Sequence, residues 1–402
     1  MEKKRFYNSL LFKLFLGIVA GILIGSLANE PVINVINTLK AIMGNLISYI
    51  VPLIILGFIT PAIVSLKSNA GKVLTATLFL CYLSSIGAAT FSFLAGKVII
   101  PGLNIAADQA AGNKLPEMLF KLEIAPIMPV MTSLVTAILI GLAVVWTKSE
   151  TWEKLLNEFG NIVLAIVNKV IIAILPFYIA ATFATLAYEG VIIHELPVFL
   201  TVIVIVLIGH YLWLALLYGI GGAVSKTNPL EVVKHYGPAY LTAVGTMSSA
   251  ATLSVALRCA KKAKTLDPTI RDFVVPLCAN THLCGSVLTE TFFVMVVSQI
   301  LYGQLPSTGS MILFILLLGI FAIGAPGVPG GTVVASLGLI TAILGFNDTG
   351  VALILSIFAL QDSFGTACNV TGDGALALIV TGWFHKVPGR NGNPVHVDEG
   401  EN

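Results

Sequence analysis

The chain has 402 residues, of which 57% are apolar and only 10% are charged, and its formal net charge is +2. Soluble globular domains carry about 25% charged residues, so this composition predicts a polytopic helical membrane protein whose surroundings are membrane lipid. A charge this small and this evenly spread provides no basic surface, and no nucleic-acid partner is expected. The five cysteines are an odd number and lie in or beside apolar stretches, which favours buried free thiols over disulfides.

Apolar segments long enough to cross a bilayer recur along the first half of the chain. Residues 3–5 are Lys, Lys and Arg, so the amino terminus is expected in the cytoplasm, and the apolar run after it is expected to stay as the first span. The polar stretch 102–121 predicts an external loop. Pro126 and Pro129 predict a bent or split helix at 124–146. The predicted spans are 10–28, 32–66, 73–100, 124–146, 152–186 and 192–224.

The second half of the sequence predicts, twice in succession, a broken helical hairpin followed by a long helix. Residues 228–264 are interrupted by Gly-Thr-Met-Ser-Ser at 245–249 and flanked by lysines on both sides, so this segment is expected to enter the membrane and return. Residues 307–345 are interrupted by a glycine- and proline-rich stretch at 324–332, which cannot continue a helix. Two matched breaks predict an inverted repeat with a binding site near the midplane. Close helix packing is the alternative interpretation of the glycines.

The last apolar helix contains polar side chains at helical spacing. Asp362, Thr366, Asn369 and Asp373 follow one another at steps of four, three and four residues, so they share one face. A carboxylate at membrane depth costs several kcal/mol unless it meets a partner, a cation or water. The stripe therefore predicts a ligand site. A polar stripe satisfied by neighbouring helices is the alternative.

Three motifs resemble the dicarboxylate/amino acid:cation symporters, the family of the glutamate-transporter homologues. They are Met-Ser-Ser-Ala-Ala-Thr-Leu at 247–253, Gly-Val-Pro-Gly at 327–330 and Asn-Val-Thr-Gly-Asp at 369–373. The resemblance covers the whole chain and implies an all-α polytopic fold with eight transmembrane helices and two re-entrant hairpins. It further implies an elevator mechanism, a homotrimer, and an inner or plasma membrane location with both termini cytoplasmic.

The resemblance also divides the chain into a scaffold and a moving transport domain. The scaffold comprises 1–72, with the first two spans, and 102–190, with the external loop and spans four and five. The transport domain comprises the third span at 73–101 and residues 191–385. Within 191–385 lie the sixth span, hairpin 1 at 228–264, the seventh span at 268–302, hairpin 2 at 307–345 and the eighth span at 348–385; 386–402 is a polar tail.

Carried over residue by residue, the resemblance assigns roles to the polar stripe and the hairpin tips. Asp362 pairs with the substrate ammonium group, Asn369 holds its α-carboxylate, and Asp373 binds a transported cation, Na+ or H+; no resident cofactor is expected. The other substrate positions are Ser248, Ser249, Ser286, Val328, Gly365 and Thr366. The other cation positions are Asn369, Cys278, Asn280 and Ile323, and Tyr82, Ser84 and Ser85 lie near a further cation site on the third span.

Two departures from the family pattern bear on the substrate. Members that carry acidic substrates have an arginine where this chain has Gly365, and some have an arginine where it has Met247. A second substrate carboxylate without a nearby cation would be buried unpaired at a cost of several kcal/mol. These departures favour a neutral amino acid, with serine or threonine as the first guess. An acidic amino acid or a dicarboxylate is the alternative within the family.

The seventh span departs further, at residues that bear on the coupled cation. His282 replaces a sodium-coordinating amide and Cys284 replaces a carboxylate, and soft sulfur suits an alkali cation poorly. At least one sodium site is therefore expected to be missing. His282 either couples protons near neutral pH or is a hydrogen-bonded core residue. Glu290, two helical turns on, is expected either to pair with His282 or to face an aqueous cavity.

The same residues bear on three other classes of protein. An intramembrane aspartyl protease needs two carboxylates in contact, whereas Asp362 and Asp373 are separated by roughly 16 Å along a helix at 1.5 Å per residue, so no enzyme is expected. An ion or solute channel also places polar residues in broken hairpins. A membrane sensor would bind its ligand without turnover. The glycine- and proline-rich tips favour a carrier with one occluded pocket.

Overall fold

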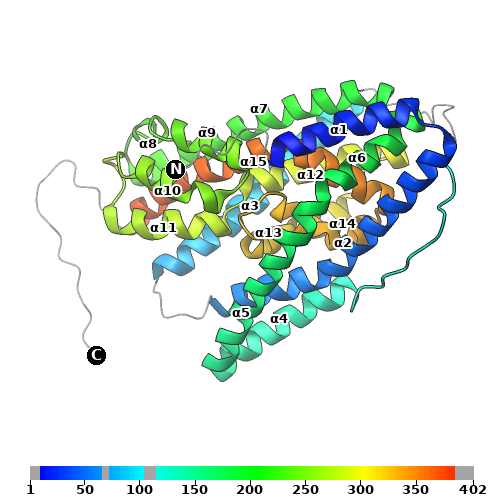
Figure 1. The fold of residues 1–402 in the computed structure, drawn as a ribbon. Helices are drawn as coiled ribbons and strands as arrows, with labels where there is room; N and C mark the ends of the chain where they lie inside the picture. Colours follow the sequence, from blue (N-terminus) through cyan, green and yellow to red (C-terminus); the bar gives the residue numbers. More distant parts are fainter. Residues whose placement is uncertain (1–9, 66–71, 104–114, 385–402) are drawn as a thin grey trace, which may run out of the picture.

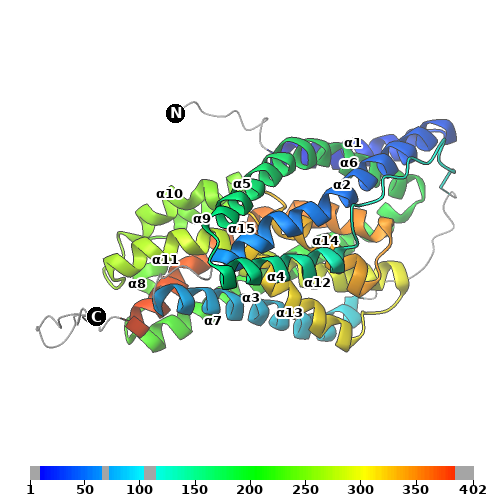
Figure 2. The ribbon, with the colours of Figure 1, turned by 90° about the horizontal axis from the view of Figure 1, so that it is seen from below.

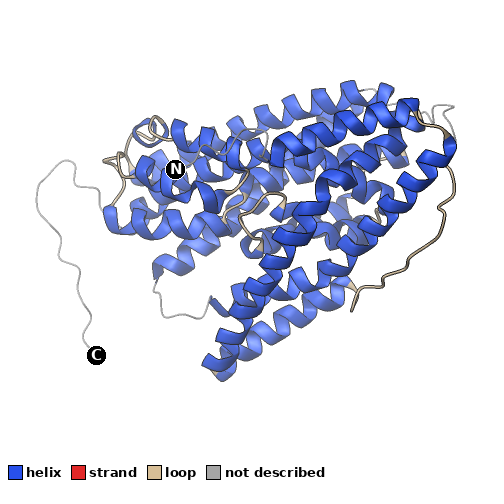
Figure 3. Ribbon diagram, viewed as in Figure 1, coloured by secondary structure: helices blue, strands red, loops and turns tan. Residues whose placement is uncertain are grey.

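The computed structural model describes residues 10–65, 72–103 and 115–384, and within these ranges every regular element is helical (Figure 3). The predicted tail at 386–402 lies outside the described residues, as does the middle of the predicted external loop. In the first half the elements are α1 (Leu10–Leu27), α2 (Glu30–Ser65), α3 (Lys72–Ile99), η2 (Ile100–Leu103), α4 (Val130–Thr147), α5 (Glu150–Ile166), η3 (Val167–Ile171), α6 (Ile172–Tyr188) and α7 (Val191–Ser225). In the second half they are α8 (Leu230–Val233), α9 (Gly237–Thr246), α10 (Ser249–Ala260), α11 (Pro268–Thr281), α12 (Cys284–Tyr302), α13 (Thr308–Gly324), α14 (Gly331–Leu344) and α15 (Asp348–Phe384).

The prediction of an all-α polytopic membrane protein is confirmed. Six helical stretches among the described residues are long and apolar enough to cross a membrane. Two further apolar helices, α1 and α4, have 18 residues each, which at 1.5 Å per residue nearly matches a hydrocarbon core of about 30 Å. Together they give the eight predicted spans: α1, α2, α3, α4, α5–η3–α6, α7, α11–α12 and α15.

One predicted helix, at 124–146, begins later than expected. Residues 115–129 are not helical and α4 starts only at Val130, so the prediction of a bent or split helix was wrong. The segment before α4 is held along α2 instead (Figure 1): Asn37 and Asn45 donate their side-chain amides to the carbonyls of Pro116 and Leu122. Proline has no N–H to donate and clashes with the preceding turn, so the two prolines exclude the helix rather than bend it.

Both predicted hairpin breaks are present. In hairpin 1, α9 ends at Met247, which has a positive φ of 54°, and the Ser248 hydroxyl accepts a bond from the Ala251 N–H to start α10. In hairpin 2, α13 ends before Ala325 and α14 starts after Gly330, whose φ is 70°. A third break was not predicted: the seventh span stops at Thr281 and resumes at Cys284.

The helices α12 and α15 form the interior of the molecule. In each of these two spans 89% of the most apolar window is buried, compared with 33% in α5–η3–α6 and in α7. The helix α15 packs against α7, α9, α11 and α12, and α12 also packs against α3. Figure 2 shows α12 and α14 lying between α2 on one side and α3 and α13 on the other. Residues on α12 and α15 are therefore enclosed by protein.

The helices α1 and α6 pack closely through glycine. Gly17, Gly21 and Gly25 recur every four residues on α1, and a Cβ at each would meet a backbone carbonyl of α6. Small residues at this spacing let two helix backbones approach each other. The packing interpretation of glycine thus applies to this outer pair, whereas the glycines at 327 and 330 lie in the non-helical tip of hairpin 2.

Candidate functional site

The polar stripe of the last helix lies in the interior. Asp362, Thr366, Asn369 and Asp373 all belong to the unbroken helix α15 and are between 1% and 4% exposed. Such burial makes each polar group depend on a protein partner or a ligand. The described partners of the stripe come from two places: the tip of hairpin 2, and the break between α11 and α12 with the first residues of α12.

Asp362 contacts the tip of hairpin 2. Its Oδ2 accepts a hydrogen bond of 2.7 Å from the Gly330 N–H. The carboxylate borders a void of about 10 Å³, room for about one water molecule. The ten described residues that line this void include no Lys or Arg, and two of them, Leu14 of α1 and Leu175 of α6, come from outside the second half of the chain. A void of this size has no room for an amino acid in this conformation.

Asn369 caps the start of α12. Its Oδ1 accepts from the N–H groups of Gly285 at 2.7 Å and Ser286 at 3.2 Å, and its Nδ2 donates to the Ser286 hydroxyl at 2.9 Å. The first N–H groups of a helix lack partners within it, and the N-cap residue Leu283 has no polar side chain to satisfy them. Because Nδ2 carries two hydrogens, one donor of Asn369 is left without a described partner.

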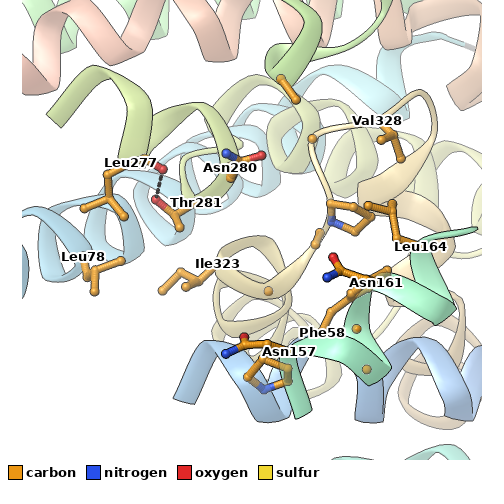
Figure 4. Close-up of a pocket in the computed structure, with 18 of the residues that line it drawn as sticks. Phe58, Leu78, Asn157, Asn161, Leu164, Leu277, Asn280, Thr281, Ile323 and Val328 are labelled. Atoms are coloured by element: carbon orange, nitrogen blue, oxygen red, sulfur yellow. Dashed lines mark hydrogen bonds between the residues drawn. The ribbon is translucent and has the colours of Figure 1, made fainter. Parts of the chain in front are cut away.

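The two hairpin tips are joined to each other. The Ser248 hydroxyl donates to the Gly327 carbonyl at 2.6 Å, and the Ala250 N–H donates to the same carbonyl at 3.3 Å. A Cβ at Gly327 would lie 2.9 Å from the Ala279 carbonyl oxygen, so the close approach requires glycine. Ser249 is buried as the first residue of α10, and Val328 lies within the tip of hairpin 2 (Figure 4). The substrate positions predicted at the tips therefore lie on two connected loops.

His282 occupies the break in the seventh span and joins three elements. Its Nδ1 lies 3.0 Å from Oδ1 of Asp373, and its Nε2 lies 2.9 Å from the Ser84 hydroxyl of α3; His282 is 0% exposed. A Cβ at Gly372 would lie 2.9 Å from Cε1 of the imidazole, so glycine there makes room for the ring. Oδ2 of Asp373 and the Ser85 hydroxyl are buried without a described hydrogen-bond partner.

Tyr82, the third residue predicted near a cation site on α3, points elsewhere. Its hydroxyl donates to the Leu316 carbonyl of α13. Ser84 thus contacts the imidazole directly, and Tyr82 does not belong to the cluster around Asp373.

Glu290 does not pair with His282, so that prediction was wrong. The Ser336 hydroxyl of α14 donates to Oε1 of Glu290, while Oε2 is buried without a described partner. Glu290 is 0% exposed, so the alternative prediction, that it faces an aqueous cavity, was wrong as well. The residue instead connects α12 to the second arm of hairpin 2.

The other predicted cation positions are dispersed. Asn280 and Ile323 line a cavity of about 540 Å³ (Figure 4). Cys278 is buried with its Sγ 3.7 Å from that of Cys81. In the described part of the chain no three His, Cys, Asp or Glu side chains are grouped to hold a metal ion, so an alkali cation would need carbonyl and hydroxyl oxygens as well. All five cysteines are buried and free, as predicted.

Comparison with known proteins agrees with the resemblance seen in the motifs. The model of the sodium:dicarboxylate symporter family matches residues 10–383. The chain is 30% identical over 235 residues to excitatory amino acid transporter 2 of Mus musculus, an alignment that covers 56% of this chain and 40% of that protein. It is 30% identical over 205 residues to excitatory amino acid transporter 1 of Homo sapiens and of Ambystoma tigrinum, covering 51% of this chain and 37% of each relative. The alignments thus span less than half the length of these relatives.

Proposed function

The chain belongs to the sodium:dicarboxylate symporter family, and on that premise we propose that it is a cation-coupled symporter of a neutral amino acid. It is a multi-pass membrane protein of a transporter family. We place it in the inner or plasma membrane with both termini in the cytoplasm. The observation that carries the proposal is the surroundings of Asp362: a buried carboxylate that borders a void with no basic residue among its described lining.

Asp362 is the residue that selects the substrate ammonium group. A desolvated ammonium requires a charged acceptor, and Asp362 bonds to the Gly330 N–H through one oxygen. The substrate α-carboxylate lies toward the free hydrogen of Asn369 Nδ2 and the Ser248–Ser249 tip. In this conformation the Ala250 and Ala251 N–H groups already donate to the Gly327 carbonyl and the Ser248 hydroxyl, so what the start of α10 offers the carboxylate is the positive end of a helix. Thr366, Ser286 and Val328 line the remainder of the pocket.

The proposal that the substrate has a neutral side chain rests on the lack of basic residues in the described lining beside Asp362. Gly365 stands where acidic-substrate members carry arginine and Met247 where some members do, and the described lining of the Asp362 void supplies no replacement. A second carboxylate would be buried without a partner. An acidic amino acid is the second candidate, and the specific observation that favours it is the sequence similarity to the excitatory amino acid transporters.

Transport proceeds by sliding of one domain against a scaffold. In this proposal 1–72 and 102–190 form the scaffold of a homotrimer, and 73–101 with 191–385 move. The contact of Leu14 and Leu175 with the Asp362 void supports this division, since it puts the binding site against scaffold helices. Cation binding orders the tips, substrate bridges Asp362, Asn369 and the Ser248–Ser249 tip, and hairpin 2 then closes before the domain slides.

The coupled cation is Na+ or H+. Oδ2 of Asp373 and the Ser85 hydroxyl are oxygen groups without described partners, which suits a hard cation. His282, which already contacts Asp373, and Glu290, which has one unpartnered oxygen, are the groups that would carry a proton. Either cation is cargo rather than a resident cofactor.

Counterflow in proteoliposomes tests the proposal. Purified protein is reconstituted, loaded with unlabelled serine, threonine or aspartate, and given the labelled amino acid outside, with sodium and proton gradients imposed separately. We expect counterflow of a neutral amino acid that depends on one of the two gradients. Counterflow of aspartate alone would favour the acidic alternative. Flux without counterflow would indicate a channel, and binding without flux a sensor.

A further inference from the structure

The outer helix α7 carries a buried histidine near the middle of its apolar stretch. His210 lies within Val198–Ser225, a segment apolar enough to cross a membrane, and is 2% exposed. The helix α7 packs against both α12 and α15 (Figure 1). A buried polar ring costs free energy unless its nitrogens are hydrogen-bonded. The partners of His210 therefore indicate what the side chain does.

The imidazole uses one of its two nitrogens. Nε2 lies 3.1 Å from the Gly285 carbonyl oxygen and 2.9 Å from the Thr289 hydroxyl, both of α12. A carbonyl oxygen can only accept, so Nε2 carries the hydrogen. Nδ1 is buried without a described partner, a cost that an apolar side chain of similar size would avoid. What this position gains from a histidine is therefore the N–H at Nε2.

The carbonyl that accepts this N–H belongs to a peptide group that Asn369 contacts from the other side. The Gly285 oxygen and the Ser286 N–H are the two polar ends of one planar peptide unit. The Ser286 N–H donates to Oδ1 of Asn369 at 3.2 Å. One peptide group thus connects a donor on α7 to an acceptor on α15. Hydrogen bonds in such a chain polarise one another, so the bond from Nε2 strengthens the bond to Oδ1.

The first turn of α12 depends on such contacts for its position. The α-helix stops at Thr281 and starts again at Cys284, and the N-cap residue Leu283 makes no side-chain cap bond. Because the turn is not a continuation of α11, its place is set by the helices beside it. His210 bonds its carbonyl side, and Asn369 bonds its N–H side.

These contacts also determine which way the Asn369 amide points. Oδ1 accepts from the N–H groups of Gly285 and Ser286. A flipped amide would place a donor against a donor at both positions, so the oxygen stays toward α12 while this turn stays in place. The amide nitrogen then donates one hydrogen to the Ser286 hydroxyl, and its other hydrogen has no described partner.

We propose that His210 is a positioning residue for amino acid binding. By bonding to the Gly285–Ser286 peptide group, it keeps the Asn369 amide oriented with its nitrogen toward the substrate α-carboxylate. The inference rests on the proposed function, which assigns that carboxylate to Asn369. His210 acts through Asn369 and does not contact the substrate. Neutral and acidic amino acids share the α-carboxylate, so the inference is the same for both candidate substrates.

Counterflow by two variants of His210 tests the proposal. His210→Phe keeps a planar ring and removes the N–H, whereas His210→Gln keeps an amide N–H at a similar reach. We expect the phenylalanine variant to raise KM about fivefold or more and to leave the maximal rate per folded protein within about twofold, because only substrate binding is weakened. The glutamine variant should restore KM to within about twofold of the unmodified protein.

Trp213→Phe is the matched control on the same helix. Trp213 lies about one turn beyond His210, is 7% exposed, and has a buried indole N–H without a described partner. The substitution therefore also removes a buried N–H from α7, but one that is not bonded to α12. It should leave KM unchanged.

Hydrogen exchange provides a second readout that does not depend on transport. The Ser286 N–H is followed by mass spectrometry of the reconstituted full chain. We expect it to exchange at least about threefold faster in His210→Phe than in the unmodified protein, and at the unmodified rate in His210→Gln. His210→Asn, whose amide is too short to reach Gly285, replaces the phenylalanine variant if that variant does not fold.

Two results would overturn the positioning role. One is a variant without the N–H whose KM equals that of the unmodified protein, even where the maximal rate falls, since that pattern indicates loss of folded protein alone. The other is an equal exchange rate of the Ser286 N–H with and without the Nε2 donor. Absence of counterflow by the unmodified protein would instead refute the proposed function.

Discussion

The two innermost spans of this chain differ from its outer spans in how completely protein encloses their residues. In α11–α12 and in α15, 89% of the most apolar window is buried, and the stripe from Asp362 to Asp373 lies inside that enclosure. In α5–η3–α6 and α7 the share is 33%, and outer residues such as Leu200 and Ile208 are more than half exposed. Polar groups persist at membrane depth where protein or a ligand surrounds them. The difference places the candidate chemistry in the enclosed helices.

The enclosed helices also tolerate less change in volume. The interior of a protein is close-packed, so one added methyl group is felt. An outer residue that contacts lipid or solvent can exchange for another of similar polarity. Paired substitutions, one inside and one outside, therefore test the comparison directly.

The largest effect is expected from Asp362→Asn. The amide still accepts the bond from Gly330, so the chain should fold and insert. The substrate ammonium, however, loses its charged partner, and losing one member of a buried ion pair costs about 3–5 kcal/mol. We expect counterflow of a neutral amino acid to fall by roughly 100-fold or more.

The outer counterpart is Glu158→Gln on α5, at an exposed position. It removes the same charge and should leave counterflow within about twofold, because exposed charges contribute little. Uptake by the Asp362 variant that equals that of the unmodified protein would refute its role in binding the ammonium group.

The next effect is expected on stability, from Gly285→Ala. A Cβ at Gly285 would lie 2.5 Å from the Cys368 Cβ and 2.5 Å from the Gly365 carbonyl oxygen. Overpacking of this kind costs about 3 kcal/mol at the upper end of its usual range, so thermal unfolding in detergent should occur at a lower temperature. A Cβ at Gly219 of the outer helix α7 meets nothing within 4 Å, and Gly219→Ala should unfold like the unmodified protein. Equal transitions for the two variants would contradict the comparison.

Much of the fold was predictable from the sequence because hydropathy and glycine–proline content act locally. The eight spans and the two tip breaks follow from these properties alone. The start of α4 is the exception: Pro126 and Pro129 predict bends within a helix, whereas the chain before Val130 is not helical and is held by asparagines of α2. That contact joins residues about eighty positions apart, and no local pattern contains it.

The site was predictable where it lies on one continuous helix. The α15 stripe needed only helical periodicity, and its residues are buried together. The break at His282–Leu283 contains neither glycine nor proline, and the N–H groups it exposes are satisfied by Asn369 from another helix. Once the seventh span breaks there, the two-turn spacing from His282 to Glu290 no longer fixes a common face. Glu290 accordingly contacts Ser336 of α14.

A smaller effect is expected from His282→Asn, which tests the cluster around that break. An asparagine is too short to span from Ser84 to Asp373, so two buried hydrogen bonds are lost at a cost of about 2 kcal/mol. We also expect the pH dependence of uptake to shift, because His282 is one of the groups proposed to carry the coupled proton. Ser84→Ala removes only the contact to Nε2 and serves as the control. A pH profile of the His282 variant that matches the unmodified protein would make the residue structural.

The smallest effect is expected from Ser336→Ala on α14. The substitution removes the hydroxyl that donates to Glu290 and leaves both oxygens of that buried carboxyl without a described partner, at a cost of about 1 kcal/mol in unfolding free energy. Thr341→Ala is the outer counterpart on the same helix, because Thr341 is an exposed residue whose described hydroxyl bonds go to carbonyls of its own helix. It should change stability by less than about 0.5 kcal/mol. Both variants are compared by thermal unfolding and by counterflow. If Thr341→Ala lowered the unfolding free energy more than Ser336→Ala, burial would not be what makes a polar contact of this hairpin important for stability.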